Sequence, residues 1–292
     1  MPPMPLEIID SEIDVHGHRL FVKWFRHALD VNGTKKQDSP FVVMLHEGLG
    51  CVEMLRDVPE KIARLTGCNV MAYDRLGHGC SDRLPSSHVH NEYILDEAWK
   101  FFPEVLDQCD IPKAFLWGHS DGGTMALLFA GRFPQRVSGV ITEAAHVYVD
   151  TMTVQGIKTA VKAWEAGNLR EKLTRYHGKN VDGIFHRWST IWLSDSFAQW
   201  NIEALLKDVT APVLAFQGVD DHYGEPGQLM SISEKIGGTS QRVMIPGCGH
   251  IPHLQAFDAV ASKAVEFIKS CCQLSPESEI QERDSLKKIE LG

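Results

Sequence analysis

Alternating apolar and polar positions open the chain. Residues 7–15 and 19–27 both alternate, and His16-Gly17-His18 separates them, which predicts a β-hairpin with a short glycine-containing loop. Unbroken apolar runs preceded by turn residues follow at 41–45, 70–73 and 114–117. Continuous apolar runs of this length are typical of parallel strands that are covered on both faces. The pattern therefore predicts a mostly parallel sheet that begins with an antiparallel hairpin.

Helical periodicity fills the segments between these strands. Residues 58–65 end before Gly67, and residues 92–109 place apolar side chains on one helical face. After a strand at 137–141 the alternation stops, and residues 147–208 become helical, aromatic and polar. It resumes with further strands and helices at 213–216, 226–236, 242–245 and 254–270.

This order predicts one α/β domain with an interruption. Residues 1–146 and 209–272 form its core, and residues 147–208 form an insertion. From about residue 273 to residue 292 Pro, Glu, Ser, Asp and Lys dominate, which favours a flexible tail.

Composition narrows the functional classes. The 292 residues are 43% hydrophobic, which is enough for a full core, and the net charge is −9. Lys and Arg form no stripe that could follow a phosphate backbone, so we expect no nucleic-acid partner. No run of eighteen apolar residues and no signal-like start are present, so we expect no membrane partner. Seven irregularly spaced cysteines favour a reducing, cytoplasmic location.

The first chemical motif is Gly118-His119-Ser120-Asp121-Gly122-Gly123. It directly follows the predicted strand at 114–117 and opens a helical run at 124–132. A serine in a tight turn between strand and helix presents its hydroxyl outward, and glycines on both sides let strand and helix approach. Ser120 is therefore the predicted nucleophile.

A second motif, His46-Glu47-Gly48-Leu49-Gly50, lies where the strand at 41–45 ends. Its backbone N–H groups, those of Gly48 or Leu49 together with that of Asp121, are predicted to form an oxyanion hole. The alternative interpretation is a flexible turn.

Fourteen histidines compete to be the base of Ser120. His250 is preferred because it follows the last predicted strand in a tight glycine-rich loop, and His253 is its nearest rival. Cys248, His250 and His253 could also be metal ligands, but no matching second cluster is evident, and we expect no metal.

The carboxylate that orients the base should follow the preceding strand, where Asp220 and Asp221 stand together. Asp221 is preferred, and Asp220 is the alternative. The chain order is then Ser120, Asp221, His250, as expected for residues on successive strand ends of one parallel sheet.

Together these motifs resemble the α/β-hydrolase family, over roughly residues 10–270. The segment Tyr73-Asp74-Arg75-Leu76-Gly77-His78-Gly79-Cys80-Ser81 is similar to the loop after the family's fourth strand, and Gly249-His250 to its histidine loop. The departure is Glu47, where many relatives have a second glycine. The resemblance implies an eight-stranded, mostly parallel sheet with helices on both faces, and a helical cap inserted after the sixth strand, here at 147–208.

Within the family, the resemblance is to the serine hydrolase branch with a helical cap, of the valacyclovir-hydrolase-like or carboxylesterase-like kind. It implies hydrolysis of a small-molecule ester, lactone or thioester through an acyl-enzyme on Ser120, without a cofactor. The cap would contribute the pocket residues Trp188, Trp192 and His177. Asp121 beside the nucleophile could favour a cationic group on the substrate.

Two alternatives remain open on the sequence. The same fold and triad serve enzymes that hydrolyse a carbon–carbon bond of a ring-cleavage diketone. A receptor could also keep the triad and bind a small molecule without turnover. Either a monomer or a homodimer is compatible with the sequence.

Overall fold

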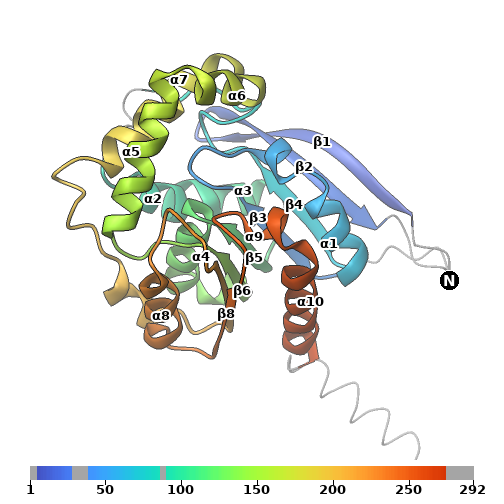
Figure 1. The fold of residues 1–292 in the computed structure, drawn as a ribbon. Coiled ribbons are helices and arrows are strands. Elements are labelled where there is room, and N and C mark those ends of the chain that lie inside the picture. Colours follow the sequence, from blue (N-terminus) through green and yellow to red (C-terminus); the bar gives the residue numbers. More distant parts are fainter. Residues whose placement is uncertain (1–4, 28–38, 86–89, 274–292) are drawn as a thin grey trace, which may run out of the picture.

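The computed structural model describes residues 5–27, 39–85 and 90–273. Eight strands among these residues form one sheet in the order β1-β2-β4-β3-β5-β6-β7-β8 (Figure 1). β2 pairs antiparallel with β1 and β4, and the pairs from β4 to β8 are parallel. The predicted fold class is confirmed. The strands are β1 (Leu6–Val15), β2 (His18–His27), β3 (Phe41–Leu45), β4 (Asn69–Tyr73), β5 (Ala114–His119), β6 (Val137–Glu143), β7 (Val213–Gly218) and β8 (Ser240–Ile245).

The predicted hairpin is confirmed as β1 and β2. Val15 pairs with His18, so only His16 and Gly17 form the turn. Both have positive φ, 54° and 78°, which is the backbone twist that two-residue hairpin turns require. Gly17 adopts this conformation without steric cost.

The continuous apolar strands supply a core on each face of the sheet. In β3, Val43 and Leu45 join one apolar cluster, while Val42 and Met44 join the other, because successive side chains point to opposite faces. On the Val42 side lie η1 (Val52–Leu55), α1 (Val58–Thr66) and α10 (Phe257–Gln273). On the Val43 side lie α2 (Tyr93–Asp96), α3 (Phe102–Gln108), α4 (Asp121–Arg132) and α8 (Pro226–Lys235). Short turns η4 (Pro134–Arg136) and η6 (Glu203–Asp208) complete the connections.

Two predicted helices are interrupted. The one predicted at 92–109 contains a π-helical turn, η3 (Glu97–Phe101), between α2 and α3. Pro103 follows this turn and has no N–H to give to the carbonyl one turn earlier, which accounts for the wider turn. The helix predicted at 254–270 is divided at Ala256, whose φ of −141° ends α9 (Pro252–Gln255) before α10 begins.

The chain between β6 and β7 holds further helices, α5 (Thr151–Glu165), α6 (Asn168–His177), η5 (Gly178–Asn180) and α7 (Val181–Trp192). They lie together beyond the sheet at the upper left of Figure 1. Their two ends meet, because Ile202 N–H donates to Val147 O at 2.8 Å and Val149 N–H donates to Trp200 O at 3.2 Å. The predicted tail lies outside the described residues from residue 274 onward.

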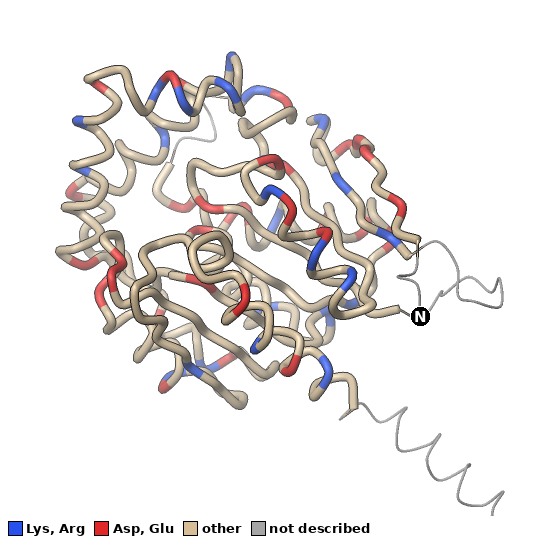
Figure 2. The backbone as a smooth tube through the Cα atoms, turned by 45° about the vertical axis from the view of Figure 1, so that its right-hand side comes forward, with Lys and Arg blue, Asp and Glu red and all other residues tan. Residues whose placement is uncertain are grey.

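Charged positions are spread over the molecule. Figure 2 shows acidic and basic residues interspersed along the helices and loops. Within the described ranges, no helix is both long enough and apolar enough to cross a membrane.

Candidate active site

Ser120 lies in a strained turn between β5 and α4. Its φ of 51° and ψ of −118° lie outside the regions that residues with a side chain usually adopt. The turn is possible because the residues two positions before and after Ser120, Gly118 and Gly122, are glycines. A Cβ at Gly118 would lie 2.1 Å from Gly122 O, and a Cβ at Gly122 would lie 2.2 Å from Leu45 O. The Ser120 side chain therefore lies at the carboxyl edge of the sheet, at the first turn of α4.

The structure brings Ser120, His250 and Asp221 into one hydrogen-bonded chain. Ser120 Oγ lies 3.1 Å from His250 Nε2, and His250 Nδ1 lies 2.9 Å from Asp221 Oδ1. A carboxylate can only accept, so Nδ1 carries the proton and Nε2 is left to accept one from the serine. This arrangement can activate an alcohol as a nucleophile.

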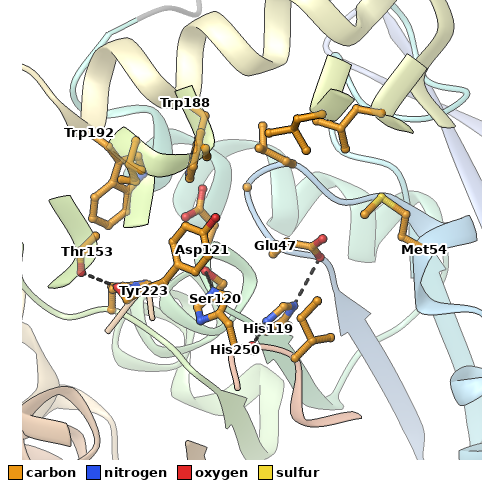
Figure 3. A pocket seen from close by; sticks show the side chains of 18 residues that line it. Glu47, Met54, His119, Ser120, Asp121, Thr153, Trp188, Trp192, Tyr223 and His250 are labelled. Atoms are coloured by element: carbon orange, nitrogen blue, oxygen red, sulfur yellow. Dashed lines mark hydrogen bonds and ion pairs between the residues drawn. The ribbon is translucent and has the colours of Figure 1, made fainter. Parts of the chain in front are cut away.

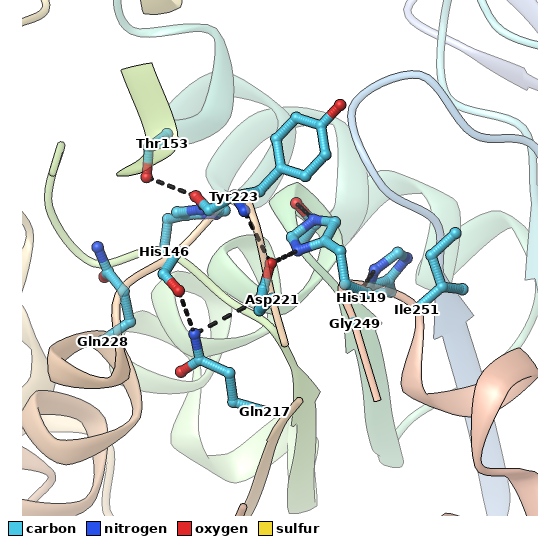
Figure 4. A network of polar contacts seen from close by, with 12 residues as sticks. His119, His146, Thr153, Gln217, Asp221, Tyr223, Gln228, Gly249 and Ile251 are labelled. Atoms are coloured by element: carbon cyan, nitrogen blue, oxygen red, sulfur yellow. Dashed lines mark hydrogen bonds and ion pairs between the residues drawn. The ribbon is translucent and has the colours of Figure 1, made fainter. Parts of the chain in front are cut away.

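Asp221 is buried and hydrogen-bonded on several sides (Figure 4). Tyr223 N–H donates to Oδ1 at 2.8 Å, and Gln217 Nε2 lies 3.4 Å from Oδ2. Burial raises the pKa of Asp221, but the hydrogen bond and charge of His250 outweigh burial, and the net pKa lies below the ordinary value. Asp220, the alternative acid, is exposed.

The pKa of His250 is set by burial and by three neighbouring side chains. Burial lowers the pKa of His250, and the hydrogen bond and charge of Asp221 raise it. The imidazoles of His119 and His146 lower it further, so the net pKa lies below the ordinary histidine value. The ring is therefore neutral, and ready to accept a proton, at neutral pH.

The rival ligands and bases at this loop have other partners. His253 Nδ1 lies 3.0 Å from Glu143 Oε2, and its backbone N–H donates to the same oxygen at 2.7 Å. Cys248 Sγ lies near Gln255 Oε1, at 3.8 Å. His253 thus points to a buried acid beneath the site, whereas His250 points to Ser120.

The loop after β3 turns its carbonyl groups toward three side chains. Arg75 Nη2 donates to Glu47 O at 2.6 Å. His78 Nε2 lies 3.1 Å from Gly48 O, and His177 Nε2 lies 2.9 Å from Leu49 O. These contacts could not be predicted, because they join residues that are 28 to 128 positions apart.

The predicted oxyanion-hole donors remain open to a ligand. Gly48, Leu49 and Asp121 all line the cavity above Ser120. Within residues 5–27, 39–85 and 90–273, no hydrogen bond uses the backbone N–H of any of these three residues. An oxyanion is bound by backbone N–H groups that have no other acceptor and that lie on a loop held in place. Here the carbonyl contacts hold the loop, and the N–H groups have no other acceptor among the described residues.

The interpretation of His177 as a pocket residue needs correction. Its Nδ1 accepts from Gly79 N–H at 2.9 Å while its Nε2 faces Leu49 O, and it is absent from the cavity wall. Both ring nitrogens are thus used to join α6 to two core loops. The sequence could not show which core loops this residue would meet, because Gly79 and Leu49 are 98 and 128 positions away.

A cavity of about 220 Å³ lies beside Ser120. Figure 3 shows Trp188 and Trp192 on one side of the serine and Glu47 and Met54 on the other. The wall of the cavity is mainly apolar. It includes Met54, Ile157, Leu169, Leu173, Trp188 and Trp192. The predicted pocket residues Trp188 and Trp192 both lie in this wall.

Two carboxylates belong to the cavity wall, those of Asp121 and Glu47. Asp121 is 1% exposed and accepts a hydrogen bond from Tyr93 Oη at 2.7 Å. No Lys or Arg is found among the described residues that line the cavity. A ligand that carries a carboxylate would therefore meet the carboxylate of Asp121 and no Lys or Arg side chain.

Buried His119 and half-buried Glu47 form an ion pair that sequence reasoning missed. His119 Nδ1 lies 3.4 Å from Glu47 Oε2, and both residues line the cavity (Figure 3). Burial raises the pKa of Glu47, but contact with His119 outweighs it, so the net pKa is lowered and the carboxylate is ionised. The available signal was Glu47 itself, at the position where the family resemblance implies a second glycine.

Comparison with known proteins agrees with this architecture. A family profile described as the alpha/beta hydrolase fold matches residues 40–194. A zearalenone hydrolase of Cladophialophora bantiana is 31% identical over 99 residues, 34% of this chain and 37% of that protein. The chain spans about half or less of the length of the curated relatives it matches.

Solved structures share the whole fold at low identity. The 2-hydroxy-6-oxo-6-phenylhexa-2,4-dienoate hydrolase of Rhodococcus sp. strain RHA1 has a TM-score of 0.74 at 16% identity, covering 91% of this chain and 100% of that one. The naproxen esterase of Bacillus subtilis has a TM-score of 0.68 at 18% identity, covering 90% and 92%.

Proposed function

Because this chain belongs to the alpha/beta hydrolase fold family, we propose that it is a serine hydrolase of small-molecule carboxylic esters, lactones or thioesters. The observation that carries the proposal is the hydrogen-bonded chain from Ser120 through His250 to Asp221, which opens onto an apolar cavity. The partner is a small-molecule substrate. A cytoplasmic location, and a monomeric or homodimeric state, remain predictions from the sequence.

In the proposed reaction, His250 Nε2 takes the proton of Ser120 Oγ as this oxygen attacks the carbonyl carbon of the substrate. The carbonyl oxygen becomes an oxyanion, and the N–H groups of Asp121 and of the loop after β3 stabilise it. The imidazolium then gives its proton to the departing alkoxide, alcohol is released, and an acyl-enzyme remains. Water attacks this ester while His250 takes its proton, and the imidazolium then gives this proton to Ser120 Oγ as the bond from Oγ to the acyl carbon breaks, so that the acid leaves and Ser120 and His250 are regenerated.

The cavity supports a small and mainly apolar acyl or alcohol group. Its volume of about 220 Å³ excludes a long chain or a polymer held entirely inside. The carboxylate of Asp121, close to the nucleophile, supports a finer preference for a neutral or cationic substrate.

The charge of the cavity also separates two candidate reactions. The Rhodococcus neighbour is named for a dienoate, which carries a carboxylate. Glu47 is paired with His119, so the carboxylate of Asp121 remains as the uncompensated charge, and no Lys or Arg among the described wall residues could bind the carboxylate of such a substrate. Ester hydrolysis is therefore preferred over cleavage of a carbon–carbon bond in a dienoate.

A fluorophosphonate probe and a substrate panel test the proposal. Mass spectrometry should find the adduct on Ser120, and Ser120→Ala should lose both labelling and turnover of p-nitrophenyl esters. A vinylogous 1,5-diketone bearing a carboxylate should be turned over poorly. Ester turnover that survives Ser120→Ala would overturn the mechanism, and stoichiometric binding without turnover would favour a receptor.

A further inference from the structure

A second acid–base pair, Glu47 and His119, lies against the proposed triad and is not used in the reaction steps above. His119 immediately precedes Ser120 and is 2% exposed. Its Nε2 lies 2.6 Å from the backbone oxygen of His250, and its Nδ1 lies 3.4 Å from Glu47 Oε2. The pair thus joins the loop after β3, the end of β5 and the histidine loop after β8, each of which carries a part of the site.

The surroundings of His119 specify its protonation state. One ring nitrogen faces a carbonyl and the other faces a carboxylate, and both of these groups accept hydrogen bonds. Nδ1 is within ion-pair distance of Glu47 but makes no hydrogen bond to it, so the doubly protonated ring donates to His250 O and pairs its charge with Glu47, whereas a neutral ring leaves the carboxylate without a counter-charge. Burial lowers the pKa of His119, but the contact and charge of Glu47, with the charge of Glu143, raise it above its ordinary value.

The position of this cation matters because the rings of His119 and His250 are 5.1 Å apart. A fixed positive charge at this distance disfavours a second imidazolium and keeps His250 neutral to lower pH. The titratable groups facing the two rings are Glu47, Glu143 and His253 around His119, and Asp221, His146 and Tyr223 around His250. Asp221 acts in the opposite direction, so the two neighbours set the basicity of His250 between them.

We propose that Glu47 and His119 are a charged pair of positioning residues, which holds the backbone of His250 in place and keeps its side chain a neutral base. The proposal deepens the function given above and rests on it for the kinetic part alone. It also gives a reason for an acidic residue at position 47: Glu47 stabilises the cation that His119 must carry.

Histidine ring ¹⁵N spectra test the charge directly, without any substrate. In a protein sample labelled with ¹⁵N on histidine, the ring signals of His119 are assigned by their loss in His119→Gln. At about pH 7.5 they should show a proton on both ring nitrogens. In Glu47→Gln the ring should become neutral, since the amide can donate to Nδ1 while Nε2–H still serves His250 O. A bare ring nitrogen on His119 of the unmodified protein would overturn the proposal even if Ser120 proves to be the nucleophile.

Kinetics then test the consequence. In Glu47→Gln and His119→Gln the acid limb of kcat/KM should move to higher pH, with activity about three- to tenfold below the unmodified protein near pH 6 and within about twofold near pH 8.5. Glu53→Gln, an exposed glutamate in the next turn of the chain, is the matched control and should behave as the unmodified protein.

The two glutamine variants also separate charge from packing. A merely structural pair would lower the melting temperature of both variants and leave the shape of the pH profile unchanged, which would contradict the proposal. The rate of fluorophosphonate labelling should follow the same shifted profile, because it reports the basicity of His250 in a single step. Glu47→Asp, which keeps the charge on a shorter side chain, should restore part of the original profile.

Discussion

The hydroxyl of Tyr93 donates to Asp121 Oδ2 at 2.7 Å and itself accepts from Trp192 Nε1 at 2.8 Å. One residue of α2 therefore fixes both the carboxylate beside the nucleophile and a tryptophan of the cavity wall. All three side chains are buried, so each depends on the others for its hydrogen bonds.

Tyr93→Phe should lower the free energy of unfolding by about 1–3 kcal/mol, because it leaves two buried polar groups without a partner. Urea unfolding followed by tryptophan fluorescence measures this change. Tyr176→Phe is the control at a half-exposed tyrosine of α6. Equal stability of the two variants would show that the hydroxyl of Tyr93 has no such role.

Asp121→Asn should reduce the preference for cationic substrates. We expect the ratio of kcat/KM for an amino-acid ester to that for a neutral ester of equal size to fall about fivefold or more, because the attraction to a buried carboxylate is lost. The ratio is the proper measure, since the backbone N–H of this residue is a proposed oxyanion donor. A ratio near one in the unmodified protein, unchanged by the substitution, would exclude a charge preference.

Asp221→Asn and Asp220→Asn form a matched pair at adjacent positions. The first should reduce kcat on the order of 10³–10⁴-fold, because an amide does not hold His250 in the required tautomer. The second changes an exposed carboxylate and should leave kcat within about twofold. Steady-state kinetics on one p-nitrophenyl ester measures both, and the reverse outcome would make Asp220 the orienting acid.

The pH dependence follows from the lowered pKa of His250. The reaction needs this ring neutral, and a lowered pKa means that protonation begins only at more acidic pH. Activity should therefore persist below the ordinary histidine pKa of about 6.5 before it declines. A kcat/KM profile whose acid limb lies at or above that value would contradict this electrostatic account.

His177→Asn should lower kcat about tenfold with a smaller effect on KM, because Leu49 O loses its partner and the proposed oxyanion hole becomes less rigid. His186→Asn, an exposed histidine on α7, is the control within the same helical segment. Loss of substrate affinity without loss of kcat would return His177 to the binding role first expected for it.

The mostly parallel sheet, and the grouping of the three residues of the hydrogen-bonded chain, could be predicted because both depend on where the strands end along the sequence. Parallel strands end at one edge, so polar residues just after β5, β7 and β8 must lie near one another. The choice of Asp221 over Asp220 was harder, since neighbouring residues differ only in the direction of their side chains. In the structure the side chain of Asp221 is buried and that of Asp220 is exposed.

Contacts between distant segments could not be predicted in this way. His177 and Leu49 are 128 positions apart. The apolar period of the inserted segment predicts helices, but it does not predict which core loops these helices contact. Glu47 and His119 likewise required coordinates, because each belongs to a motif that is interpreted through its glycines. The π-helical turn before Pro103 was missed as well, because the apolar period of residues 92–109 continues across it.

The short backbone pairing between residues 147–149 and 200–202 has an evolutionary consequence. Because the helices between β6 and β7 leave and rejoin the core at one stem, their sequence can drift, or be exchanged by an engineer, while the sheet keeps its register. The exchange has one condition. A transplanted helical segment must bring its own donor for the carbonyl of Leu49, or the selectivity it confers would come at the expense of rate.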